Sequence, residues 1–282
     1  MGVFQKSCAV AALSVGLTVS SVSAIAQTNY ILAGASPGGL WSLLGVGVDK
    51  ALRASDPNAT VTYQTSGGGF ANAALVSTNK VNMGIMHDAE AKLAVEGGDP
   101  YKAPVSNIRA MAVMYNFAAF QPMVSKEFAE KYGVFSYEDL AAKKPPVRLI
   151  INKRGNIAYN QAVEVLEAYG VTLKDIESWG GSVLYAGSGG AVELMKNRQA
   201  DMTTNNVFIG HSSVREIVNT IPVVMLPIRD QVIRSVRTKM GTLDMVIPKA
   251  AYDFLPGDYK TLALTAMLVV NADTPDDEVY KI

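Results

Sequence analysis

The sequence contains few residues that could support covalent or metal chemistry. Only Cys8 is a cysteine among the 282 residues, and it lies in an N-terminal segment that we expect to be removed. The remaining chain therefore excludes thiol catalysis, disulfides and cysteine-based metal sites. The two histidines, His87 and His211, are far apart and form no H-x-x-x-H pattern, so a metal site is not expected.

The sequence also lacks an excess of charge of either sign. Lys and Arg number 25, Asp and Glu number 25, and the formal net charge is zero. A neutral chain has no overall field to attract nucleic acid or an acidic surface. Because 49% of the residues are hydrophobic, a chain of this length can bury one sizeable core or two.

The N-terminal segment is apolar but too short for a membrane span. Lys6 precedes an almost wholly apolar run over residues 8–19, and the A-x-A pattern of residues 24–26 follows. A bilayer span needs roughly 20 apolar residues. The pattern predicts a signal peptide, residues 1–26, cleaved before Gln27, and export to the periplasm. The alternative is a short anchor helix that stays attached.

The rest of the chain alternates apolar runs, Gly-rich turns and helical periods. Strands are expected at 30–33, 60–64 and 83–86, and helices at 40–52 and 70–78. Strands that alternate with helices through short loops predict a mainly parallel α/β sheet.

The pattern changes between residues 111 and 126. Two strand-like runs, 111–115 and 120–125, follow each other without a helix, as at a hinge. A second α/β run then starts with a strand at 147–151 and a helix over 155–169. Further strands are expected at 183–185, 202–204 and 223–225. We therefore expect two α/β lobes, residues 27–119 plus 241–282 and residues 120–240.

Three strand-to-helix loops are rich in glycine and serine. They are residues 36–39, 66–69 and 188–190. Glycine lets a ligand approach the backbone, and the helix N-terminus after each loop carries a partial positive charge. Such loops suit a carboxylate or phosphate at the carboxyl ends of the strands. The alternative is that the glycines only make tight turns.

The first loop also allows an enzymatic interpretation. Residues 34–38 match G-x-S-x-G, and Ser36, Asp88 and His211 follow the order of a hydrolase triad. Pro37 argues against it, because proline lacks the backbone N–H that an oxyanion hole uses. No dinucleotide fingerprint occurs either. No catalytic residue and no cofactor are expected.

Single residues near these loops are further candidates, each with a structural alternative. Trp41 could form a pocket wall or belong to the core. Asn72 could face a ligand or hydrogen-bond locally. Arg154 could clamp a carboxylate or lie on the surface. Asn205 and Asn206 could line a cleft or make turns.

Several segments resemble motifs of the TAXI family, the TRAP-transporter-associated extracytoplasmic solute receptors. The family's G-T-G-G-T-Y, T-G-G-S-V-x-N-L and Q-S/N-D motifs have counterparts in residues 35–41, 66–72 and 86–88. Later counterparts are residues 152–156, 169–170, 197–201, 247–252 and 279–282. The resemblance covers nearly all of the chain after residue 26, and the order and spacing of the motifs carry it.

The resemblance implies a two-lobed, type II-like periplasmic binding protein with its ligand cleft between the lobes. Such a receptor binds a small organic acid or amino acid and delivers it to a TRAP membrane subunit without catalysis, and most act as monomers. Carried over to this chain, the family's ligand positions are Gly39, Leu40, Trp41, Ser66, Gly67, Gly69, Asn72, His87, Asp88, Arg154, Gly155, Asn156, Asn205, Asn206 and His211.

Departures from the family motifs suggest a different solute. Leu40 and Trp41 stand where the family has Thr and Tyr, Gly69 stands where it has Ser, and Lys153 and Arg154 add positive charge. These changes predict an organic acid with an apolar or aromatic body packed against Trp41 and a carboxylate held by Arg154. Two alternatives are a periplasmic serine hydrolase using Ser36 and a sensor-type binding module without a transporter.

Overall fold

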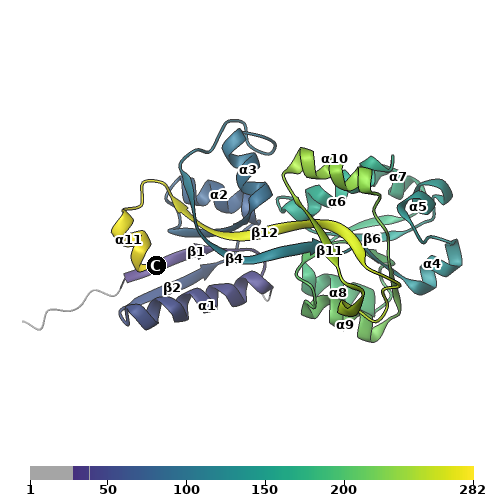
Figure 1. The fold of residues 1–282 in the computed structure, drawn as a ribbon, viewed down its shortest axis with the longest axis horizontal. Coiled ribbons are helices and arrows are strands. Elements are labelled where there is room, and N and C mark those ends of the chain that lie inside the picture. The colour runs from purple at the N-terminus through teal and green to yellow at the C-terminus, as the bar shows by residue number, and fades with distance from the viewer. Residues whose placement is uncertain (1–27, 38) are drawn as a thin grey trace, which may run out of the picture.

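The chain folds into two lobes, each built around its own sheet (Figure 1). The computed structural model describes residues 28–37 and 39–282, so the predicted signal peptide lies outside the described residues. Within them, one sheet has seven strands and the other has five. This arrangement confirms the predicted two-lobed α/β fold.

The larger sheet has the strand order β2-β1-β3-β12-β4-β9, with β11 also paired to β12. Its strands are β1 (Thr28–Ala33), β2 (Ala59–Gln64), β3 (Met83–His87), β4 (Ile108–Phe120), β9 (Asn206–Val207), β11 (Leu243–Ile247) and β12 (Tyr259–Asn271). The first three are parallel, but β12 is antiparallel to β3, β4 and β11. The prediction of a mainly parallel sheet is therefore wrong for this lobe. The physical reason is that β12 returns from the second lobe and enters the sheet from its far end (Figure 1).

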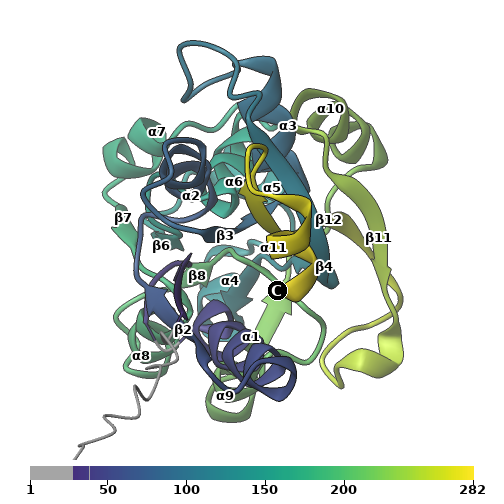
Figure 2. The same cartoon turned by 90° about the vertical axis from the view of Figure 1, so that its left-hand side faces the viewer.

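Helices cover both faces of the larger sheet. Helix α1 (Leu40–Ser55) lies on one face, and α2 (Gly69–Ser77) and α3 (Asp88–Glu96) lie on the other (Figure 2). Successive side chains of a strand point to opposite faces. Accordingly Leu32 packs in the cluster on the α1 side, and its neighbour Ala33 packs in the cluster that contains α2 residues. A short helix, α11 (Asp276–Lys281), follows β12.

The smaller sheet has the order β10-β5-β8-β6-β7. Its strands are β5 (Met123–Ser125), β6 (Arg148–Ile151), β7 (Ser182–Tyr185), β8 (Met202–Thr203) and β10 (Val223–Met225). Its helices are α4 (Lys126–Tyr132), α5 (Tyr137–Lys143), α6 (Ile157–Ala168), α7 (Leu173–Ser178), α8 (Ser188–Lys196), α9 (Ser212–Thr220) and α10 (Asp230–Met240), and a 3-10 turn, η1 (Lys249–Ala251), precedes β12. Strand β6 runs parallel to β7 and β8, as expected from the alternating pattern, whereas β5 is antiparallel to its neighbours.

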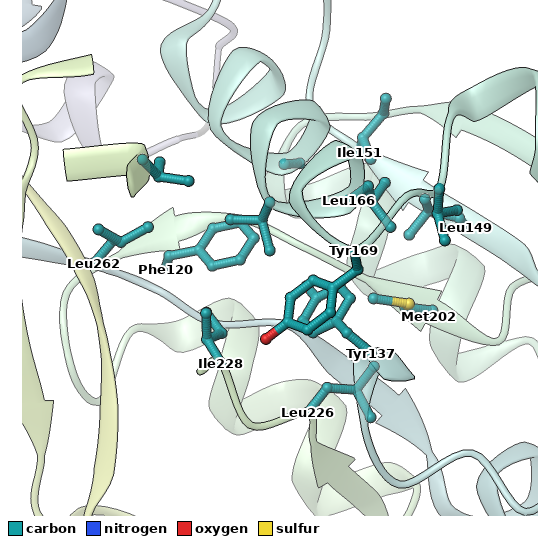
Figure 3. Packing of buried hydrophobic residues seen from close by; sticks show 14 of the residues in the cluster. Phe120, Tyr137, Leu149, Ile151, Leu166, Tyr169, Met202, Leu226, Ile228 and Leu262 are labelled. Carbon is teal, nitrogen blue, oxygen red and sulfur yellow. The ribbon is translucent and has the colours of Figure 1, made fainter. Parts of the chain in front are cut away.

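The second lobe has an aromatic core that strands of the larger sheet help to build. The rings of Tyr137 and Tyr169 stack with centroids 4.9 Å apart (Figure 3). Phe120 at the end of β4 and Leu262 in β12 belong to the same cluster. The two long strands therefore connect the lobes by shared packing as well as by covalent linkage. Residues 247–259 also pack against the second lobe, although β11 and β12 on either side of them pair in the larger sheet. The boundary between the lobes therefore differs when it is drawn by strand pairing and when it is drawn by core packing.

The predicted pair of strand runs at the crossing differs from the structure. Residues 108–120 form the single strand β4, which has three register irregularities against β12, and β5 begins only at Met123. Pro122 separates the two strands, because proline cannot donate to a ladder hydrogen bond.

In the described ranges, no helix combines the length and the hydropathy that a bilayer crossing requires.

Candidate functional site

A cavity of about 190 Å³ lies between the two lobes. The ends of β1, β2 and β3 contribute one side of it, and the loops that follow β6 and β7 contribute the other. Eleven of the predicted ligand positions line this cavity: Gly39, Leu40, Trp41, Ser66, Gly67, His87, Arg154, Asn156, Asn205, Asn206 and His211. Segments 171 residues apart in the sequence, from Leu40 to His211, therefore meet at one place.

Asn72 does not line the cavity, although the sequence made it a ligand candidate. Its side chain is fully buried; Nδ2 donates to the carbonyl oxygens of Gly34 at 2.8 Å and Ile85 at 2.6 Å. Its Oδ1 accepts from Ser66 Oγ at 2.6 Å. Asn72 thus joins the ends of all three parallel strands, and its role is to hold the loops in place.

Gly69, Asp88 and Gly155 are also outside the cavity lining. A β-carbon at Gly69 would overlap the buried carboxylate of Glu90. Asp88 accepts a hydrogen bond from the backbone of Ala89 and faces Thr265. Gly155 lies where the loops of the two lobes touch, at a positive φ of 85°. The structure does not bring these three predicted ligand positions into the cavity lining, and Gly69 and Asp88 are instead the first residues of α2 and α3.

Nine residues that line the cavity were not among the predicted ligand positions. They are Ala35, Ser36, Tyr115, Asn152, Lys153, Ala158, Gly187, Ser188 and Val207. The third Gly-rich loop was a signal for Gly187 and Ser188. No sequence pattern indicated Tyr115 as a cavity residue, because only the pairing of β4 with β12 brings this strand residue beside His87.

The charged side chains that line the cavity are cationic. Among the described residues that line it, Lys153 and Arg154 are cationic and none is an Asp or Glu. The guanidinium of Arg154 is exposed and lies over the rings of Tyr159 and Tyr185, with its carbon 5.9 and 5.7 Å from their centroids. These aromatic faces hold the cation at the mouth of the cavity.

Two helix N-termini at the cavity have no side-chain cap. Helix α1 starts after Gly39 and helix α8 after Gly187, and neither glycine has a side chain that could accept from the first free N–H groups. The N-termini of α6 and α9 are capped by Asn156 and His211. The uncapped ends leave N–H donors and partial positive charge on both sides of the cleft.

A polar chain forms the wall on the second lobe. Asn152 Nδ2 donates to Asn205 Oδ1 at 3.1 Å, and Asn205 Nδ2 donates to Ser188 Oγ at 3.1 Å. This chain fixes the orientation of Asn205 and joins the loops after β6 and β7. On the first lobe, Trp41 is only 6% exposed, so it contributes an edge to the cavity and packs mainly in the core.

His211 caps α9 through its ring. Nδ1 accepts from the backbone N–H of Ser213 at 3.1 Å and lies 2.8 Å from Ser213 Oγ. Burial lowers the pKa of His211 below its ordinary value of 6.5. The neutral ring is therefore the form that fits the folded protein, since a protonated Nδ1 could not accept the capping hydrogen bond.

His211→Asn should make the melting temperature less sensitive to acid. As pH falls through 6.5, the unfolded wild-type chain takes up a proton that the folded protein resists, so stability falls. Asparagine is a good N-cap that does not titrate. Loss of a cap costs about 1 kcal/mol. Between pH 7 and pH 5 the melting temperature of the wild type should therefore fall by about 2–4 °C more than that of the variant. Equal losses in calorimetry would contradict this assignment.

The hydrogen bonds do not assemble a triad around Ser36. His211 Nδ1 is engaged by Ser213, and the carboxylate of Asp88 is engaged by Ala89 and Thr265. Within residues 28–37 and 39–282, no hydrogen bond joins Ser36 to either group. The geometry gives no support to the hydrolase alternative.

A larger hollow, about 660 Å³, lies on the second lobe beside α4. It contains none of the predicted site residues, and its charged side chains include the ion pairs Arg148–Asp201 and Arg198–Glu127. Cations that are already paired offer less to an anionic solute than Lys153 and Arg154 do. In the described ranges, no group of three or more potential metal-ligating side chains occurs.

Comparison with known proteins gives a consistent picture of the fold. Residues 32–282 match the NMT1-like family. The structure of MatC from Rhodopseudomonas palustris with bound malate is similar, with 12% identity, a TM-score of 0.59, and coverage of 92% of this chain and 82% of that chain.

Two further solved structures share the fold. A binding protein component of an ABC phosphonate transporter from Pseudomonas aeruginosa is 12% identical over 90% of this chain and 72% of that chain, with a TM-score of 0.51. The periplasmic binding protein BugD is 13% identical over 90% of this chain and 79% of that chain, with a TM-score of 0.53. The fold is that of the type II periplasmic binding proteins.

Proposed function

Since this chain belongs to the NMT1-like family, we propose that it is a periplasmic receptor that binds a small organic acid and delivers it to a membrane transporter. The receptor performs no catalysis. It closes its two lobes around the solute, and the membrane component distinguishes the closed form from the open one.

The charge of the cavity carries this proposal. Lys153 and Arg154 line it, no acidic residue is among its described lining, and the uncapped N-termini of α1 and α8 face it from opposite lobes. A carboxylate would find cationic groups and free N–H donors there, with no like charge to repel it. The solutes named for two similar structures, malate and phosphonate, are also anions.

The same lining favours an organic acid over an amino acid. The ammonium group of an amino acid would lose its hydration on entering the cleft, and no lining carboxylate would replace it. A cavity of about 190 Å³ is small beside the 300–1,000 Å³ common for drug-sized ligands, so the solute is small. Leu40, Trp41 and Val207 provide apolar surface for its body.

The resemblance to TAXI receptors supports a TRAP-type membrane partner, and the pattern of residues 1–26 supports export to the periplasm. Uptake of a radiolabelled acid by cells with and without the gene tests the transport role. Uptake that does not change would favour the sensor-type alternative if the purified protein still binds the acid.

A thermal-shift screen of the purified protein tests the binding role. The panel contains amino acids, dicarboxylates, aromatic acids and their neutral esters. A solute at about 100 times its Kd adds about 2.7 kcal/mol, which corresponds to roughly 5–11 °C for a chain of this size. Shifts with acids but not with their esters are expected. An ester that shifts the protein as strongly as its acid would contradict the anion site.

Succinate and aspartate provide a matched pair of solutes. Both are four-carbon diacids, and they differ by one ammonium group. We expect the Kd of aspartate to be at least about tenfold higher, because an unpaired ammonium loses about 1.4 kcal/mol or more in a cleft without carboxylates. Isothermal titration with both compounds measures the ratio, and tighter binding of aspartate would overturn the preference.

A further inference from the structure

Glu90 is a fully buried carboxylate that touches both lobes. It lies on α3 of the first lobe and is 0% exposed. Its Oε2 accepts from the backbone N–H of His87 at 2.8 Å. Its Oε1 accepts from the backbone N–H of Ile157 at 3.1 Å, and Ile157 is the first residue of α6 in the second lobe. One side chain therefore links two residues that lie 70 positions apart.

A buried carboxylate is costly unless charge and hydrogen bonds compensate for the lost water. Here the ring Nδ1 of His87 lies 3.2 Å from Oε2. The N-terminus of α6 supplies partial positive charge at Oε1. Gly69 explains how the carboxylate fits, since any side chain at this position would overlap it.

Polar contacts join Glu90 to the cavity wall. Trp41 Nε1 donates to Tyr115 Oη at 3.1 Å, and Tyr115 Oη lies 3.4 Å from His87 Nε2. Burial raises the pKa of Tyr115 to about 12, so its hydroxyl keeps its proton at neutral pH. The His87 tautomer with the proton on Nδ1 donates to Glu90 and accepts from Tyr115 through Nε2, whereas the other tautomer lets the ring accept from the backbone N–H of Glu90 as in a capping box.

The ion pairs Lys260–Asp230 and Arg237–Asp244 also join the lobes, but their side chains are exposed, and exposed pairs contribute little. The other close contacts between the cavity loops of the two lobes are uncharged. A β-carbon at Gly68 would lie 3.0 Å from the carbonyl oxygen of Gly155, and one at Gly187 would lie 3.8 Å from Ser36 Oγ. Such contacts need close approach but supply little attraction. The hydrogen bond from Ile157 N–H to Glu90 is charge-assisted, and such bonds are worth more than neutral ones.

We propose that Glu90 is a positioning residue that fastens the second lobe onto the first and fixes the His87 ring in the cavity wall. The first part concerns the protein alone, and the second part rests on the proposed solute-binding function. Glu90 acts through His87 and α6 and does not itself line the cavity.

The distance between the lobes is the direct readout. Cys8→Ser leaves the chain without cysteine, so Lys80→Cys and Lys174→Cys then carry spin labels on exposed positions of the first and second lobes. Pulsed electron resonance compares this protein with its Glu90→Gln and Glu96→Gln variants, each without solute and with succinate. Glu96 is a matched control, because it lies on the same helix and pairs on the surface with Lys92.

Glu90→Gln should raise the population with the long distance between the labels, relative to the population with the short distance, by about tenfold or more. Glutamine keeps the shape of the side chain but has one acceptor oxygen, so its amide N–H₂ must face the N–H of His87 or of Ile157. Loss of a charge-assisted hydrogen bond accounts for a change of this size. Glu96→Gln should leave the ratio unchanged. Equal distance distributions in Glu90→Gln and its parent would overturn the proposal.

A second variant and a second measurement cover the case in which Glu90→Gln does not fold. Glu90→Asp keeps the charge but withdraws the carboxylate by one methylene. The population with the short distance between the labels should fall as in Glu90→Gln. In the unaltered protein, hydrogen exchange at the Ile157 amide should be slow. Exchange as fast as in an exposed loop would overturn the proposal.

The two proposals fail in different ways. If Glu90→Gln separates the lobes but no acid of the panel binds, the positioning role stands and the proposed solute class is wrong. If acids bind equally well to Glu90→Gln and the lobe distance does not change, the proposed function stands and the positioning role is wrong.

Discussion

Replacing Gly69 with alanine is expected to lower the melting temperature by about 6–12 °C. Alanine normally favours a helix over glycine, and Gly69 is the first residue of α2. Here, however, the added methyl group would overlap the carboxylate of Glu90. The steric clash and the displaced buried charge together cost about 3 kcal/mol, which corresponds to this shift in a chain of this length.

Gly47→Ala is the matched control for this substitution. Gly47 lies inside α1, and a β-carbon there would have nothing within 4 Å. Alanine should therefore stabilise the protein by about 0.5–1 kcal/mol through its helix propensity. Scanning calorimetry of both variants measures the contrast. A Gly69→Ala protein that melts at or above the wild-type temperature would mean that Glu90 is not packed against α2.

Arg154→Ala is expected to weaken binding of the acid solute by about 10- to 100-fold. Arg154 lines the cavity mouth and lies over Tyr159 and Tyr185, which restrict its orientation before a solute arrives. A charge-assisted hydrogen bond to a carboxylate contributes about 1.5–3 kcal/mol, which corresponds to the expected loss. Because the guanidinium is exposed, added salt should reduce the difference between wild type and variant.

Two further variants separate the possible roles of the arginine. Arg154→Lys keeps the charge but loses the two-pronged geometry, so its affinity should lie between those of wild type and Arg154→Ala. Arg234→Ala removes an exposed arginine of α10 that does not line the cavity, and it should bind like wild type. If titration calorimetry gives Arg154→Ala the wild-type Kd, the carboxylate is held by Lys153 and the loop N–H groups instead.

Local pattern was enough to predict the elements that end at the cavity. The runs at 30–33, 60–64 and 83–86 are strands, each followed by a helix, as the alternation of apolar runs and Gly-rich turns indicated. Parallel strands place their carboxyl ends together, so loops that follow them meet at one edge of a sheet. For this reason most of the predicted ligand positions line one cavity.

Local sequence patterns could not predict contacts between segments that are far apart in the chain. Asn72 has the sequence context of a ligand residue, but the carbonyl oxygens of Gly34 and Ile85 engage its amide. Glu90 looks like an ordinary first-turn acid of α3, yet Ile157, 67 residues further on, donates to it. The partners of such polar groups are fixed only when the strands pair and the lobes meet.

The sequence by itself determined the two-lobed α/β class, the Gly-rich loops at the strand ends and the scarcity of groups for covalent or metal chemistry. These depend on composition and on periods of two and 3.6 residues, which are properties of short segments. The tertiary structure decided the mixed larger sheet, the place of Tyr115 beside His87 and the absence of acidic residues from the cavity lining. Each of these depends on how segments far apart in the chain pack, because burial and strand pairing select among side chains that local patterns leave equivalent.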